Sequence, residues 1–167
     1  MIRNPNSALL LRVRVWLAVF MAGLVLSGLT AFPLEWESGV LVRTFHVSAR
    51  AQVGEPALNT WLRRVHDGIV TTNHAYPFMA YGTDWLAFGH LAIAIAFIGP
   101  LIDPVRNKWV VTFGLIACAG VIPLALIAGA IRGIPPYWRL IDCSFGVFGA
   151  TPLLVCLRDV RRLESLV

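Results

Sequence analysis

Four apolar runs of about 20 residues constrain the fold of this chain more than any other feature. They cover residues 15–34, 85–102, 109–131 and 137–157. The first three contain no Asp, Glu, Lys or Arg, and the fourth is interrupted only by Arg139 and Asp142. A helix of this length crosses the hydrocarbon core of a bilayer, because each residue rises about 1.5 Å. We therefore predict an all-α membrane protein, a bundle of four transmembrane helices.

Composition supports a lipid environment. Hydrophobic residues make up 57% of the 167 positions and charged residues 14%, and the mean hydropathy is +0.72. A soluble domain of this length does not have enough interior to bury so much apolar surface. The length fits one domain, so we expect residues 1–167 to form a single integral membrane domain.

Basic residues lie at the edges of the apolar runs and form no long basic stretch, which favours membrane anchoring over nucleic-acid binding for a chain of net charge +5. Eight of the fourteen Lys and Arg residues lie in the N-terminal segment, the turn between the second and third runs, and the C-terminal tail. The positive-inside rule then places both termini in the cytoplasm. Residues 35–83 form a long extracytoplasmic loop in this topology, and the first run stays as an uncleaved anchor.

The long loop contains an amphipathic pattern. A helix can begin at Pro56, and five apolar residues then recur at spacings of three and four, which places them on one face: Leu58, Trp61, Leu62, Val65 and Ile69. This pattern predicts a helix that lies in the membrane interface or packs on a small extramembrane subdomain. Residues 39–47 are rich in Val, Leu, Thr and Phe and are expected to pair as a short hairpin with another segment, which the sequence does not identify.

Pairs of small residues four positions apart indicate where helices approach closely inside a bundle, since lipid provides no hydrophobic force between them. Three such pairs occur: Gly23 and Ser27, Gly129 and Gly133, and Gly146 and Ala150. We expect them to mark helix contacts within the chain.

Few ionisable residues lie inside the runs, where each costs about 2.5 to 3.5 kcal/mol at the bilayer centre unless it has a partner. His90 lies five residues into the second run and Asp142 five residues into the fourth, at a similar depth below the outer boundary; Arg139 lies three residues before Asp142. We take His90, Asp142 and Arg139 as candidate catalytic residues. Residues at adjoining ends extend the candidate binding set: Asp84, His74, Arg132 and Trp85, with Glu35 as a further neighbour.

Two interpretations of this cluster are open. In the first, Asp142 and Arg139 form an ion pair and His90 hydrogen-bonds a backbone carbonyl or the carboxylate, so that the group only assists helix assembly. In the second, the histidine acts as a general base or proton relay on a lipid-like substrate. No cofactor is expected: His90 is the one histidine inside an apolar run, whereas an electron-transfer haem b usually takes two, and the histidines and three cysteines lack zinc-ligand spacing.

Residues 76–90, 99–107 and 138–146 resemble an uncharacterised family of small four-span bacterial membrane proteins. The resemblance covers about residues 73–150 and implies a bacterial inner-membrane setting, with no activity or catalytic residues to transfer. We therefore expect a non-enzymatic accessory subunit or lipid-binding module, whose partners are the lipid bilayer and a membrane protein complex. The alternative is a membrane-embedded enzyme or carrier for an apolar substrate that uses the His/Asp/Arg cluster.

Overall fold

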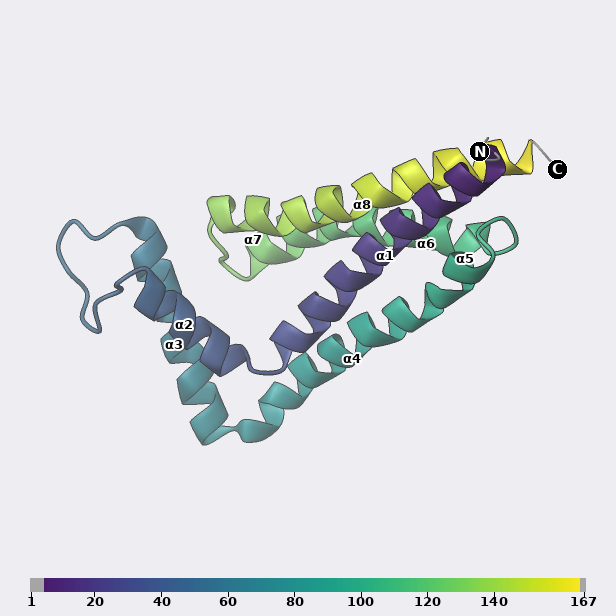
Figure 1. Ribbon diagram of the computed structural model, residues 1–167. Coiled ribbons are helices and arrows are strands. Elements are labelled where there is room, and N and C mark those ends of the chain that lie inside the picture. Colours follow the sequence, from purple (N-terminus) through teal and green to yellow (C-terminus); the bar gives the residue numbers. More distant parts are fainter. Residues whose placement is uncertain (1–4, 166–167) are drawn as a thin grey trace. The chain divides into compact units, whose positions relative to one another are not determined.

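The computed structural model describes residues 5–165, and every regular element in that range is a helix (Figure 1). In chain order these are α1 (Pro5–Ala31), α2 (Leu34–Thr44), α3 (Ala57–Ala75), η1 (Pro77–Ala80), α4 (Tyr81–Ala96), α5 (Ile98–Ile102), α6 (Lys108–Pro123), η2 (Leu124–Ala128), α7 (Gly129–Ile131) and α8 (Pro136–Glu164). Four segments are long and apolar enough to cross a membrane: Ser7–Ala31, Pro77–Ile102, Lys108–Ile131 and Pro136–Glu164. The predicted all-α class and its four spans are confirmed. Arg3, one of the basic residues used for orientation, lies outside the described residues.

The chain forms two compact units. The first comprises Met1–Leu24 and Ala92–Val167, and the second comprises Val25–Leu91. Helices α1 and α4 each contribute one part to the first unit and one part to the second.

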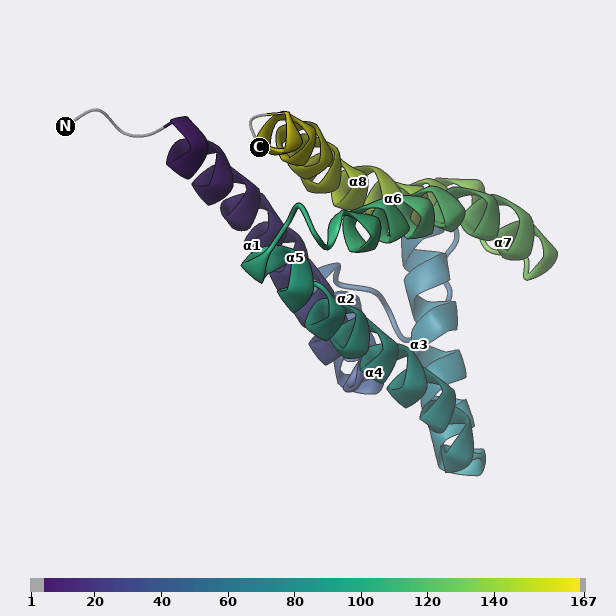
Figure 2. The same cartoon turned by 90° about the vertical axis from the view of Figure 1, so that its right-hand side faces the viewer.

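In the first unit α6 and α8 run antiparallel side by side, as both views show (Figures 1 and 2). Two glycines permit this approach: a Cβ at Gly146 would lie 2.5 Å from the Cys118 carbonyl oxygen, and a Cβ at Gly114 would lie 2.7 Å from side-chain atoms of Leu153 and Phe97. The N-terminal half of α1 completes a buried apolar core made of Val13, Leu17, Phe97, Val111, Cys118, Leu153, Cys156, Val160 and Leu163. The Phe20 and Phe97 rings pack with centroids 4.8 Å apart.

The small-residue prediction holds for Gly146 and is wrong for Gly23. A Cβ at Gly23 would meet no atom within 4 Å, whereas one at Gly28 would lie 3.0 Å from the Ala87 carbonyl oxygen. The close approach of α1 to α4 within the second unit is therefore at Gly28, outside the pair Gly23 and Ser27. Gly133 contacts nothing at its Cβ position and has a φ of +69°, so its role is to end α7 in a left-handed turn.

The α2–α3 pair belongs to the second unit. The predicted amphipathic helix is present as α3, which follows Pro56 and buries Leu62. The short hairpin expected at residues 39–47 is wrong, because α2 continues as a helix to Thr44. Its first turn contains Glu35 and Glu37, whose negative charges favour a helix N-terminus, and these outweigh the β-propensity of the residues that follow.

Polar contacts fix the α2–α3 pair at several points. The Ser38 hydroxyl lies 3.0 Å from His66 Nδ1, and Asn73 Nδ2 donates to Glu35 Oε2 at 2.9 Å. Arg63 of α3 forms a two-pronged ion pair with Glu55 in the connection between the two helices, with N···O distances of 2.7 and 2.6 Å. This contact lowers the pKa of the Glu55 carboxyl below its usual range, chiefly through the hydrogen bond from Arg63.

Candidate functional site

Arg139 lies in the first turn of α8 and reaches back to the preceding span. Its Nη1 donates to the Leu126 carbonyl oxygen at 3.2 Å. The side chain passes over Gly129, where a Cβ would lie 2.7 Å from Arg139 Cδ. The Arg139 Nε atom is buried and has no hydrogen-bond partner among residues 5–165. The arginine therefore connects α8 to the η2–α7 segment and keeps a buried donor, its Nε, without a partner among the described residues.

The backbone that Arg139 contacts is a π-helical turn. Pro123 ends the regular part of α6, and residues Leu124–Ala128 continue as the wider turn η2. A proline inside a helix removes one backbone hydrogen bond and displaces the chain, which explains an irregular turn at this place. The span is thus distorted where Arg139 contacts it.

Asp142 lies one helical turn after Arg139 and is half-buried. The two side chains form no ion pair, since Arg139 turns to Leu126 instead. Within the part of the chain that the structure describes, the Asp142 carboxylate has no hydrogen bond or ion pair of its own. An unpartnered acid inside a span is costly and is therefore a candidate for a functional role.

His90 lies in the middle of α4, in the second unit. Its Nδ1 lies 2.8 Å from the Leu86 carbonyl oxygen. A carbonyl oxygen only accepts, so we assign the proton of the neutral ring to Nδ1, which leaves Nε2 as the basic nitrogen. The His90 Cβ also lies 3.2 Å from the position of a Cβ at Gly28, so the residue packs against α1.

The backbone hydrogen bond predicted for His90 is therefore present, and the ion pair predicted between Arg139 and Asp142 is absent. His90 belongs to the second unit, whereas Arg139 and Asp142 belong to the first. Their common site stays a sequence-based prediction.

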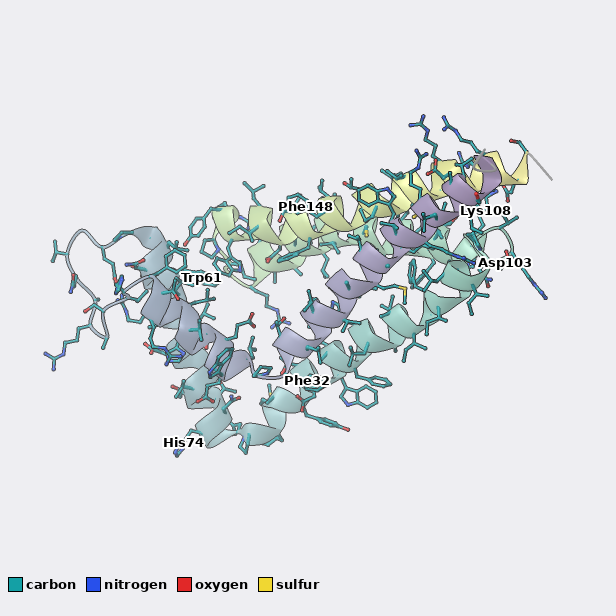
Figure 3. The ribbon with its side chains drawn as sticks, in the orientation of Figure 1. Phe32, Trp61, His74, Asp103, Lys108 and Phe148 are labelled. Atoms are coloured by element: carbon teal, nitrogen blue, oxygen red, sulfur yellow. The ribbon has the colours of Figure 1, made fainter. Side chains whose placement is uncertain are left out.

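The other candidate residues have varied surroundings. Trp85 is 58% exposed and packs edge-on against Tyr81 and Phe88, with centroid distances of 5.9 and 5.8 Å. His74 is exposed in the last turn of α3, at the corner labelled in Figure 3. Asp84 lies in the first turn of α4, where its charge favours the helix N-terminus. Arg132 is exposed at the end of α7.

Several paired charges of the first unit were not predicted from the sequence. Asp159 is fully buried and forms a two-pronged ion pair with Arg12, which joins α8 to α1. Lys108 at the start of α6 pairs with Glu164 at the end of α8 at 2.6 Å. Arg14 donates to the Leu101 and Ile102 carbonyl oxygens at the end of α5. Figure 3 shows Lys108 and Asp103 at this same end of the first unit.

A signal for Asp159 was present in the sequence. Cys156, Val160 and Leu163 continue the apolar face of α8 at spacings of four and three beyond the predicted span end at residue 157. Continuing that periodicity would have extended the helix and placed Asp159 beside the buried face, where a partner is required.

Among the described residues no group of three or more His, Cys, Asp or Glu side chains is arranged to hold a metal ion. The chain matches no protein-family model, no curated protein and no solved structure.

Proposed function

We propose that this chain is a non-enzymatic accessory subunit or lipid-binding module of a bacterial inner membrane, with four spans and both termini in the cytoplasm. The observation that supports it best is how little of each span the chain itself covers. In α8 and in the segment Lys108–Ile131, only 22% and 17% of the most apolar stretch is buried.

The uncovered side chains are large and apolar. On α8 these include Phe145 and Phe148, which are 67% and 73% exposed, and on α6 they include Ile116 at 57%. Such faces suit lipid chains or the helices of another membrane protein, which pack against apolar surface without a cost in desolvation. A scaffold or subunit needs surface of this kind, whereas an enzyme also needs an enclosed cavity with convergent polar groups.

The charged groups near the span ends also suit a structural role. Asp159 and Glu164 are paired with Arg12 and Lys108, and the guanidinium of Arg139 is held by a backbone carbonyl. Each contact joins two helical segments of the first unit. Charged side chains that are paired to hold helices together are not available as acids or bases for catalysis.

The accessory role can be tested by photo-crosslinking in native membranes. A photoreactive amino acid at Phe148, on the exposed side of α8, is expected to form an adduct of defined mass with one membrane protein or with lipid. The matched control is the same amino acid at Leu153, which is fully buried and should react only within the chain. Equal adducts from both positions would refute the exposed-face argument.

The proposed topology has its own test. Reporter enzymes fused after Val167 and before Met1 are expected to give cytoplasmic signals, and a reporter inserted near Gly54 should give an external one. Opposite signals from the two ends would mean an odd number of crossings. The bacterial setting rests on the family resemblance of residues 73–150.

One observation favours the second candidate function, a membrane enzyme or carrier for an apolar substrate that uses His90, Asp142 and Arg139. The Asp142 carboxylate has no partner among the described residues, and His90 keeps Nε2 as a basic nitrogen. The variants His90→Ala and Asp142→Asn separate the two hypotheses, with Ser144→Ala as a neighbouring control. Normal accumulation with loss of a cellular phenotype supports the enzyme or carrier; normal accumulation with normal phenotype supports the accessory role.

A further inference from the structure

The exposed face of α8 changes character along its length. Arg161 and Arg162 lie three and four residues after Arg158, so the three share one side of the helix, and all three are exposed. None of their guanidinium groups forms a hydrogen bond or an ion pair within residues 5–165. We call these three residues the basic face.

The acids nearest to the basic face are already paired. Asp159 is held by Arg12 and Glu164 by Lys108, both through contacts to other helices. Asp103, the remaining acid at this end of the first unit, accepts a hydrogen bond from the Arg106 backbone N–H. The positive charge of the basic face is therefore left without a counter-charge from these carboxylates.

Toward the middle of the span the same side of α8 is apolar. Val147 and Leu154 are 56% and 57% exposed and lie seven residues apart on this side. Thr151 between them donates its hydroxyl to the Val147 carbonyl oxygen at 2.9 Å, so the helix itself satisfies that polar group. An apolar strip that ends in three arginines has the chemistry of a lipid chain followed by a phosphate group.

We propose that this side of α8 binds an anionic phospholipid, with an acyl chain along Val147 and Leu154 and the phosphate on the basic face. The planar guanidinium fork matches phosphate oxygens in pairs, and three forks within five residues can engage one doubly charged or two singly charged headgroups. The basic face lies just beyond the apolar part of a span, where headgroups are found. This position favours lipid over a soluble acidic partner.

The inference rests on the membrane setting of the proposed function and on groups outside the His/Asp/Arg candidates. The purified full chain is incubated in mixed micelles with equal amounts of phosphatidylglycerol and phosphatidylcholine, and the lipids retained are counted by native mass spectrometry. We expect clear enrichment of phosphatidylglycerol on the natural chain. The triple variant R158Q/R161Q/R162Q should lose at least about tenfold of that enrichment, because each arginine near an anionic surface contributes roughly fivefold.

Two control variants isolate the basic face from net charge. R43Q/R50Q/R64Q removes the same charge from three other exposed arginines and should keep the enrichment. R158K/R161K/R162K keeps the charge and should retain most of the phosphatidylglycerol binding. It loses the paired hydrogen bonds that a guanidinium makes to phosphate oxygens.

Three outcomes would overturn the proposal. They are unchanged enrichment in R158Q/R161Q/R162Q, an equal loss in R43Q/R50Q/R64Q, and recruitment of a Glu-rich peptide to phosphatidylcholine micelles as strong as the lipid enrichment. The last would assign the basic face to an acidic protein segment. Because the lipid count and the phenotypes of the His90 and Asp142 variants depend on different groups, either proposal can fail alone.

Discussion

Arg12 and Asp159 form a two-pronged ion pair that joins the first span to the last across 147 residues of sequence. The Asp159 side chain is fully buried, whereas 49% of the Arg12 side chain is exposed. The two partners therefore differ in how well each can return to water when the other is removed.

This difference in exposure predicts that substitutions of the two partners lower the free energy of unfolding by unequal amounts. Arg12→Met leaves a buried carboxylate unpaired and should lower the free energy of unfolding by about 3 kcal/mol. Asp159→Leu should cost less, because the half-exposed guanidinium can be solvated. The double variant should recover most of the loss, since apolar replacements of a buried pair are often close to neutral. Unfolding in mixed micelles with increasing dodecyl sulfate measures each value, and equal losses for both single variants would contradict the argument.

The Lys108–Glu164 pair is a contrasting case. About a third of each side chain is exposed, 36% and 33%, so water and salt screen the attraction. Glu164→Gln should therefore cost less than about 1 kcal/mol in the same unfolding assay, and the loss should shrink further at high salt. A loss as large as that of Arg12→Met would show that exposure does not decide the strength of these pairs.

The backbone contact at Gly146 predicts sensitivity to a single methyl group. Gly146→Ala places a Cβ 2.5 Å from the Cys118 carbonyl oxygen, so α6 and α8 must separate, at a cost of about 1 to 3 kcal/mol. Gly120→Ala is the matched control, because its Cβ meets nothing within 4 Å; it should be neutral or stabilising by up to about 1 kcal/mol. Unfolding curves of the two variants, recorded side by side, provide the comparison.

The Glu55–Arg63 pair predicts a pH dependence outside the spans. The pKa of Glu55 is lower in the folded protein than in the unfolded chain, so its contribution is complete above the unfolded value of about 4.3 and is lost as pH falls through the folded value. The protection factors of the amides in residues 47–56, which compare their exchange with the intrinsic rate at the same pH, should therefore fall below about pH 4. Glu55→Gln should show low protection factors at every pH, and a natural chain whose protection factors at pH 3 equal those at pH 7 would refute the link.

Much of the fold could be predicted from the sequence, because apolar runs of this length directly indicate helices that lie in lipid. Span ends were less certain: hydropathy ends α8 near residue 157, whereas Val160 and Leu163 extend the packed helix to Glu164. The β-propensity of Val and Thr does not predict the α2 helix, because the acidic first turn at Glu35 and Glu37 outweighs it.

The candidate site was predictable only in part. Depth along a helix follows from residue count, which is why His90 and Asp142 could be selected. Residue count does not give the direction that a long side chain takes. Arg139 turns toward Leu126 because Gly129 leaves space for it and because Pro123 precedes a π-helical turn. The direction of such a side chain depends on tertiary contacts between segments, and residue spacing on one helix does not predict those contacts.

The connection between α7 and α8 is only four residues long, Arg132 to Pro135. Two spans joined so closely, with their backbones in contact at Gly146, can enter the bilayer during synthesis as one helical hairpin. Arg139 then arrives with its carbonyl acceptor on the preceding span already beside it. The polar fourth span can then insert together with Lys108–Ile131, which has the highest mean hydropathy of the four segments, so that this neighbour offsets the penalty of the charge.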